Sequence, residues 1–227
     1  MISQFYGVHS MESQILLETF AEVRQRFAHL DDPAHGWEHA ERVYKLALHI
    51  AEQEGADPFI VGMAALMHDL GRTANSDGIK HHAELSEIVA AEILAAHHVA
   101  PERQKAILHA IAAHSFSRNI EAHTLEALIV RDADRLESLG AIGILRWAIT
   151  ATIRRTPQTR TYHPADPFAE QHEPDDSSYM LDHFFTKLLM ISDSMATETG
   201  HQMARRRVNF MLAYLDELRS ELDTEVP

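Results

Sequence analysis

The spacing of the apolar residues is the feature that most constrains the fold. Along almost all of the 227-residue chain they recur at helical intervals, and no segment alternates apolar and polar residues as a half-buried strand does. Such a pattern is typical of amphipathic helices that pack around a shared core. We therefore predict an all-α protein. The expected helices span about 10–29, 36–54, 57–71, 82–97, 101–114, 123–136, 138–153, 179–192 and 196–222.

Prolines and glycines mark where several of these helices begin and end. Asp57-Pro58 and Ala100-Pro101 suit the first turn of a helix, and Gly55 suits a helix end. Residues 156–178 hold four prolines without helical periodicity, so we expect a long loop there. We treat 1–227 as a single domain, with a helical core over about 30–155 and a loop followed by C-terminal helices over about 156–227.

Charge and cysteine content exclude several kinds of protein. The formal net charge of −14 disfavours binding to nucleic-acid polymers and to anionic membranes. The absence of cysteine excludes disulfides, thiolate catalysis and cysteine-based zinc sites. No apolar run reaches the ~20 residues that a membrane-spanning helix needs, and the first residues do not resemble a signal peptide. We expect a cytoplasmic protein, either a monomer or a homodimer.

Four histidines lie on the inward faces of four successive predicted helices. They are His39, His68, His82 and His114, and each continues the apolar stripe of its helix. Buried imidazoles need partners, and a metal ion satisfies several of them at once. Other histidines, such as His172, show no inward placement, and we expect them at the surface.

Carboxylates accompany these histidines. Asp69 follows His68 at the end of an apolar helix, where adjacent side chains can converge on one ion. Asp132 and Asp134 lie on a helix rich in Leu and Ile, and the periodicity places Asp132 on its inward stripe. Imidazole nitrogens combined with carboxylate oxygens suit Mn, Fe, Co, Ni or Zn, and they accept Mg with more retained water.

The order of these residues resembles a known family. His39, then His68-Asp69, then Asp134 is similar to the H…HD…D signature of the HD-domain metal-dependent phosphohydrolase superfamily. The segments HGWEHAERV, AALMHDLGR, HAELS, AIAAHSFS and DADRLESLGAIG resemble its YedJ-like branch. The resemblance implies a helical HD bundle and a divalent cation, Mn²⁺ or Mg²⁺ first, bound by these four residues. Because periodicity favours Asp132, that residue stays open as the alternative to Asp134.

The resemblance also implies a reaction, the hydrolysis of a phosphate ester or anhydride in a small metabolite. A nucleotide is the expected substrate, and the branch suggests a nucleoside triphosphate pyrophosphohydrolase. Two alternatives stay open: a two-metal phosphodiesterase or di-iron oxygenase that uses all six His and Asp ligands, and a regulator that binds nucleotide or metal without turnover. The expected catalytic residues are Asp69, His82 and His114, and the expected substrate contacts are Arg72, Lys80, Asp132 and Arg146.

Overall fold

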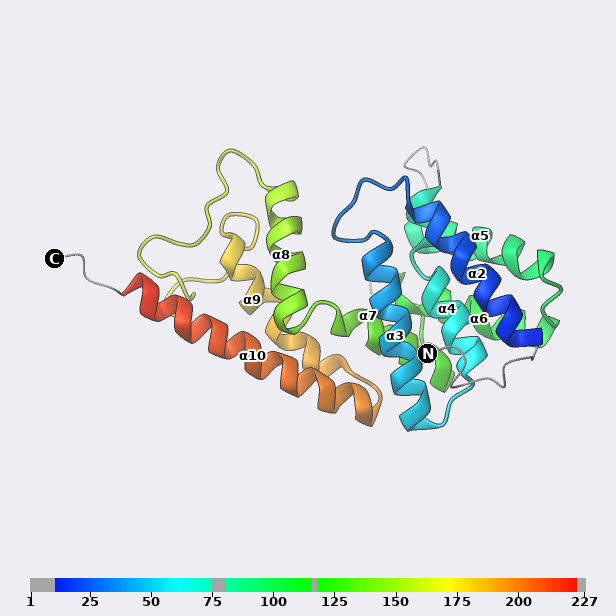
Figure 1. Ribbon diagram of the computed structural model, residues 1–227. Coiled ribbons are helices and arrows are strands. Elements are labelled where there is room, and N and C mark those ends of the chain that lie inside the picture. The colour runs from blue at the N-terminus through cyan, green and yellow to red at the C-terminus, as the bar shows by residue number, and fades with distance from the viewer. Residues whose placement is uncertain (1–10, 75–80, 116–117, 224–227) are drawn as a thin grey trace. The chain divides into compact units, whose positions relative to one another are not determined.

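The computed structural model describes residues 11–74, 81–115 and 118–223 (Figure 1). Within these ranges the regular elements are helices, apart from one isolated parallel bridge between Arg160 and Tyr179. The predicted all-α fold is confirmed. The chain divides into two compact units, Met1–Asp134 and Arg135–Pro227. The assignment of 1–227 to a single domain stays a prediction.

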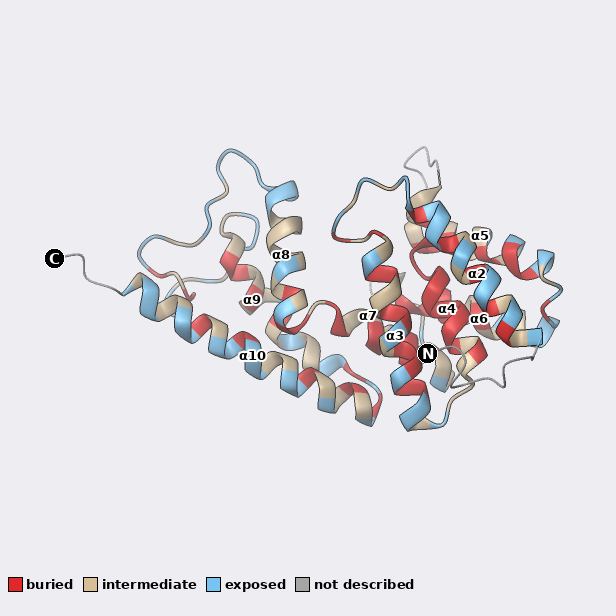
Figure 2. Cartoon of the chain, viewed as in Figure 1, coloured by how far each residue is buried: buried red, intermediate tan, exposed pale blue. Residues whose placement is uncertain are grey.

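The first unit is built around one buried helix. Its elements are α2 (Met11–Phe27), α3 (Trp37–Glu54), α4 (Pro58–Met67), η1 (Leu70–Thr73), α5 (His82–Ala96), α6 (Pro101–His114) and α7 (Leu125–Leu136). Helix α4 packs against α2, α3 and α6, and eight of its ten residues are buried. Figure 2 shows α4 buried along most of its length, and this position explains why its sequence is apolar on every side.

Local signals set both ends of α4. Asp57 caps the helix, because its carboxylate accepts hydrogen bonds from the backbone N–H groups of Phe59 and Ile60. At the other end His68 still has helical dihedral angles, but Asp69 leaves the helix with φ −108° and ψ 11°. The predicted helix over 57–71 therefore ends earlier than expected. The short 3₁₀ segment η1 follows, and the break falls between the two residues of the His-Asp pair.

A close approach of backbones joins η1 to α5. The N–H of Gly71 donates to Ser86 Oγ at 2.8 Å, and Ser86 Oγ donates to the carbonyl oxygen of His82 at 3.0 Å. A Cβ atom on Gly71 would lie 2.1 Å from that same carbonyl oxygen. Only glycine allows this contact, so Gly71 sets the distance between Asp69 and the helix that carries His82.

The second unit contains α8 (Gly140–Arg154), η3 (Met180–Asp182), α9 (His183–Thr186), η4 (Leu188–Ser194) and α10 (Glu198–Leu222). Helix α10 packs against α8 and η4. The predicted continuous helix over 179–192 is wrong, because the segment forms three short pieces. Backbone hydrogen bonds from Met180 to Arg160 and from Leu181 to Thr161, each 2.9 Å long, replace the helical ones. The indole of Trp147 also donates to the Met180 carbonyl at 3.0 Å.

One histidine of the second unit is less exposed than its sequence position suggested. His172 Nδ1 lies 2.7 Å from Asp166 Oδ2, and its Nε2 lies 2.9 Å from the fully buried Asp182. The side chain of His172 is 19% exposed, so it does lie at the surface, but both of its nitrogens are held by carboxylates. Its two nitrogens link Asp166, in the proline-containing segment 156–178, to Asp182 in η3, and these contacts help to order a segment without helical periodicity.

Among the described residues, no single helix is both long enough and apolar enough to cross a membrane. Helices α7 and α8 meet that criterion only when they are taken together as a bent pair.

Candidate metal centre

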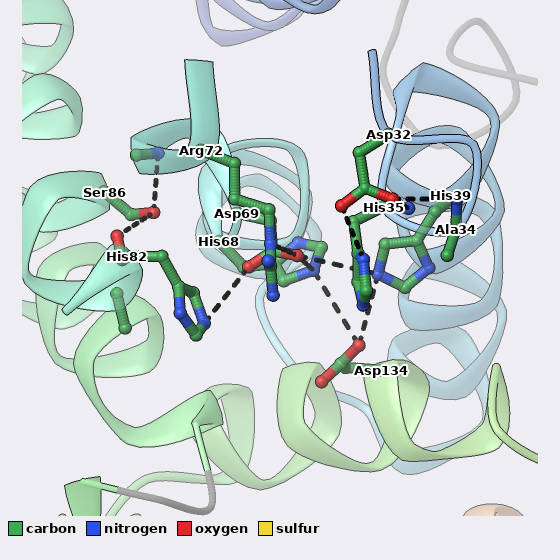
Figure 3. A network of polar contacts seen from close by, with 12 residues as sticks. Asp32, Ala34, His35, His39, His68, Asp69, Arg72, His82, Ser86 and Asp134 are labelled. Carbon is green, nitrogen blue, oxygen red and sulfur yellow. Dashed lines mark hydrogen bonds and ion pairs between the residues drawn. The ribbon is translucent and has the colours of Figure 1, made fainter. Parts of the chain in front are cut away.

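Three side chains from three helices meet inside the first unit. They are His39 on α3, His68 at the end of α4 and Asp134 on α7, and their donor atoms lie within 4.8 Å of one another. Asp134 Oδ1 lies 3.3 Å from His39 Nε2 and 3.8 Å from His68 Nε2. Figure 3 shows the three side chains directed toward one another. Both histidines are buried.

A second group of three lies beside the first. Asp69, His82 and His114 also bring their donor atoms within 4.8 Å of one another. Asp69 Oδ1 lies 3.5 Å from His82 Nε2 and 3.8 Å from His114 Nε2. The other oxygen of Asp69 lies 4.0 Å from His39 Nε2 and 3.9 Å from His68 Nε2. The Asp69 carboxylate thus faces both groups.

Hydrogen bonds to the backbone orient two of the imidazoles. Nδ1–H of His68 donates to the Ala65 carbonyl at 2.8 Å, and Nδ1–H of His114 donates to the Ile111 carbonyl at 2.6 Å. Each Nε2 then presents its lone pair to the cluster, which is the arrangement of a metal-binding histidine. Within the described part of the chain, the buried atoms His68 Nε2 and Asp69 Oδ1 make no hydrogen bond. Buried polar atoms left without partners fit a cation at this position.

The protonation states suit the same purpose. Burial lowers the pKa of His68 and of His82 to about 4, so both imidazoles are neutral near pH 7. Burial alone would raise the pKa of Asp69, but His68, which is protonated at low pH, and the guanidinium of Arg72 outweigh burial and hold that pKa far below its ordinary value. The pKa of Asp134 is likewise well below its ordinary value, because the hydrogen bond with His39 outweighs burial. Neutral imidazoles and ionised carboxylates are the forms that bind divalent metals.

The two aspartates of α7 differ in burial and in neighbours. Asp132 is fully buried, as the periodicity predicted, whereas the side chain of Asp134 is 28% exposed and faces His39 and His68. Asp134 lies in the last turn of its helix, so it can reach the cluster from outside the inward stripe.

The predicted substrate contacts fall in different places. Arg72 Nε lies 2.6 Å from Asp69 Oδ2, so this cation stands directly beside the cluster. Arg146 belongs to α8 in the second unit. Lys80 lies outside the described residues.

Sequence reasoning assigned no role to His35, which the structure brings to the edge of the cluster. Its ring packs edge-on against that of His39, with centroids 6.0 Å apart. Burial and the charge of Arg72 lower the pKa of His35 and outweigh the opposing effect of Asp32. His35 lies in the turn before α3, outside the predicted helix over 36–54, so helical periodicity gave no signal for it.

Comparisons with known proteins agree with this geometry. The family profile described as HD domain matches residues 36–139, a range that includes both three-residue groups. The Bacillus subtilis protein YpgQ is 33% identical over 196 residues, which cover 85% of this chain and 86% of YpgQ. The chain belongs to the HD domain family.

Two solved structures share the fold of almost the whole chain. YpgQ in complex with ADP superimposes with a TM-score of 0.73 at 30% identity, covering 93% of this chain and 97% of YpgQ. An HD-superfamily hydrolase from Bacillus thuringiensis gives a TM-score of 0.74 at 29% identity, covering 94% of this chain and all of that one. Ribonuclease Y of Clostridium tetani is 26% identical over 94% of this chain, which spans only 38% of that longer protein.

Proposed function

We propose that this HD-domain protein is a metal-dependent phosphohydrolase that acts on a small phosphorylated metabolite, most specifically a nucleotide. The observation that carries the proposal is the buried cluster of neutral imidazoles and ionised carboxylates around His68 and Asp69. His39, His68, Asp69 and Asp134 are the proposed ligands. A nucleotide substrate is supported by the similarity to YpgQ, whose structure contains ADP. Within this class, pyrophosphate release from a nucleoside triphosphate is the reaction we favour.

A divalent cation held there would polarise a phosphoryl oxygen and lower the pKa of a bound water. The side chains around it have separate tasks. Arg72 offsets negative charge on the phosphoryl group, because its guanidinium is already fixed against Asp69. His82 is 27% exposed and lies 3.5 Å from Asp69 Oδ1, where its neutral imidazole can orient the substrate. His114 is 3% exposed, so its task is to orient rather than to exchange protons with solvent.

The test is a release assay for phosphate and pyrophosphate over nucleotides and sugar phosphates, with Mn²⁺, Mg²⁺, Co²⁺ or Ni²⁺ present. Asp69→Ala removes the carboxylate that faces both groups, and Asp31→Ala removes an exposed carboxylate as the matched control. We expect activity in the parent and the control and none in Asp69→Ala. A higher yield of pyrophosphate than of phosphate supports the triphosphate reaction. Background release by the parent across the whole panel, with metal bound, refutes the phosphohydrolase and favours a binding regulator.

A second candidate is a two-metal enzyme, and a specific observation favours it. Six ligands form two adjacent groups of three that share the Asp69 carboxylate between them. Two divalent ions about 3.5–4 Å apart would suit phosphodiester hydrolysis, and two irons would suit an oxygenase. Metal analysis of the purified protein separates these from the single-ion enzyme. One equivalent per chain that is lost in His39→Ala but kept in His82→Ala supports a single ion. Two equivalents support the second candidate, and oxygen consumption with iron identifies the oxygenase.

A further inference from the structure

A carboxylate–histidine pair stands immediately before the helix that carries His39. Asp32 and His35 lie in the turn between α2 and α3, and the Nδ1 atom of His35 is 2.9 Å from Asp32 Oδ2. The other oxygen of Asp32 accepts hydrogen bonds from the backbone N–H groups of Ala34 and His35, at 3.0 and 3.1 Å. Three hydrogen bonds therefore hold the Asp32 carboxylate, and the carboxylate in turn holds the ring of His35.

This arrangement determines which nitrogen of His35 is available. An ionised carboxylate can only accept hydrogen bonds, so the proton of a neutral His35 ring sits on Nδ1. The Nε2 atom then carries a lone pair. The side chain of His35 is 23% exposed, so Nε2 can reach a substrate or a water that has entered from solvent.

The position of His35 relative to the cluster suits a proton acceptor better than a ligand. Its ring stands edge-on to His39, and Figure 3 shows it on the side of His39 and Asp134. However, His35 belongs to neither of the two groups whose donor atoms converge within 4.8 Å. It therefore lies beside the proposed ligand His39 without being one of the converging donors.

The ring nitrogens of the other histidines near the cluster make different contacts. His82 and His114 both direct Nε2 toward Asp69 Oδ1, at 3.5 and 3.8 Å. The Nδ1 atoms of His68 and His114 donate to backbone carbonyls, which are weaker acceptors than a carboxylate. Among the described residues around the cluster, His35 is the histidine whose Nδ1 is held by an ionised carboxylate and whose Nε2 is left accessible.

We propose that His35, oriented by Asp32, is the catalytic base that takes a proton from the attacking water. The proposal rests on the phosphohydrolase function proposed above. As the water oxygen forms its bond to phosphorus, its proton moves to His35 Nε2. The bond from phosphorus to the leaving oxygen breaks, and that oxygen keeps the electron pair. The resulting imidazolium is stabilised by Asp32 and returns its proton to solvent.

The test separates this role from metal binding and from folding. The variants are His35→Ala, His35→Gln and Asp32→Asn, and His49→Ala removes an exposed histidine of α3 as the matched control. We expect kcat to fall about 100- to 1,000-fold in both His35 variants, as for a lost general base. A fall of about 10-fold is expected in Asp32→Asn, as for a lost orienting partner. KM for the nucleotide and the affinity for Mn²⁺ measured by titration calorimetry should stay at the parent values.

Two further measurements identify the mechanism. Free imidazole should restore kcat to His35→Ala in proportion to its concentration, and should have no effect on Asp69→Ala. In the metal-free protein labelled with ¹⁵N-histidine, NMR should show the proton of His35 on Nδ1. A proton on Nε2, a kcat unchanged in His35→Ala, or a kcat lost in parallel with Mn²⁺ affinity would each overturn the role of base. Those results in an active parent enzyme leave the phosphohydrolase standing, whereas an inactive parent refutes both.

Discussion

Gly71 lies between the two parts of the candidate centre, and its replacement by alanine tests how that centre is held together. The added Cβ would meet the His82 carbonyl oxygen at 2.1 Å, the Ser86 nitrogen at 2.5 Å and Leu85 Cβ at 2.7 Å. Because two of these atoms are backbone, no side-chain rotation relieves the overlap. Helix α5 must move by roughly 1 Å to restore ordinary contact distances.

The cost of that movement can be estimated. Overpacking of a well-packed site costs about 1–3 kcal/mol. Separation of η1 from α5 also breaks the hydrogen bond from Gly71 to Ser86, which contributes about 1 kcal/mol net. The free energy of unfolding should therefore fall by about 2–4 kcal/mol, which corresponds to a fall in Tm of about 4–16 °C. Because Gly71 lies two residues after the proposed ligand Asp69, the same shift should lower the Mn²⁺ affinity about 10- to 100-fold.

Thermal unfolding and titration calorimetry measure both effects, and Gly62→Ala is the matched control. A Cβ on Gly62, which lies in α4, would meet only side-chain atoms, Tyr44 Cε2 at 3.2 Å and Leu16 Cδ1 at 3.3 Å. The gain in helix propensity, up to about 1 kcal/mol, offsets that crowding. A Gly71→Ala protein with the Tm and Mn²⁺ affinity of the parent would show that η1 and α5 do not need this close contact.

Three other substitutions probe separate parts of the protein. Asp134→Asn keeps the shape of the side chain but removes its charge, so Mn²⁺ affinity should fall at least 10-fold in calorimetry. Arg72→Gln should raise KM for the nucleotide roughly 10-fold in steady-state assays, the effect of one lost charge-assisted hydrogen bond. For His172, hydrogen bonds with Asp166 and Asp182 raise its pKa, so its stabilisation is fully present below the unfolded value of about 6.5 and is lost as pH rises through the folded value. The Tm difference between the parent and His172→Gln should therefore be larger at pH 6 than at pH 9, and an equal difference at both would contradict a charged His172.

Much of the first unit could be predicted from local pattern. Apolar periodicity located α2 to α7, and the caps at Asp57-Pro58 and Ala100-Pro101 lie where the structure has them. The apolar spacing over 179–192 predicts a continuous helix, which the structure does not contain. The backbone of this segment is instead used in hydrogen bonds to residues 160–161, about twenty positions earlier in the chain. Pairing over that separation has no periodic signature in a single sequence.

The candidate site shows the same division between local and tertiary information. Periodicity on α7 placed Asp132 inward, and the structure agrees, yet Asp134 is the carboxylate beside His39 and His68. Which of two acids meets a histidine depends on how α7 crosses α3 and α4, and spacing along one helix does not contain that information. The resemblance to the HD superfamily favoured Asp134 because a family pattern already includes the tertiary arrangement.

The polar residues of the site share one property that is visible in the sequence. They interrupt the apolar pattern of the helices that carry them. Helix α4 is apolar throughout and ends in His68, whose Nε2 atom is buried without a hydrogen bond. Burying such groups without partners costs roughly 1–3 kcal/mol each, so an apolar residue at these positions would stabilise the isolated chain. Conflicts between a local pattern and a buried polar group concentrate at functional sites. A metal ion that binds the folded state would offset this cost, so the protein should unfold at a higher temperature with Mn²⁺ than without it. This increase in Tm should be larger in the parent protein than in Asp69→Ala.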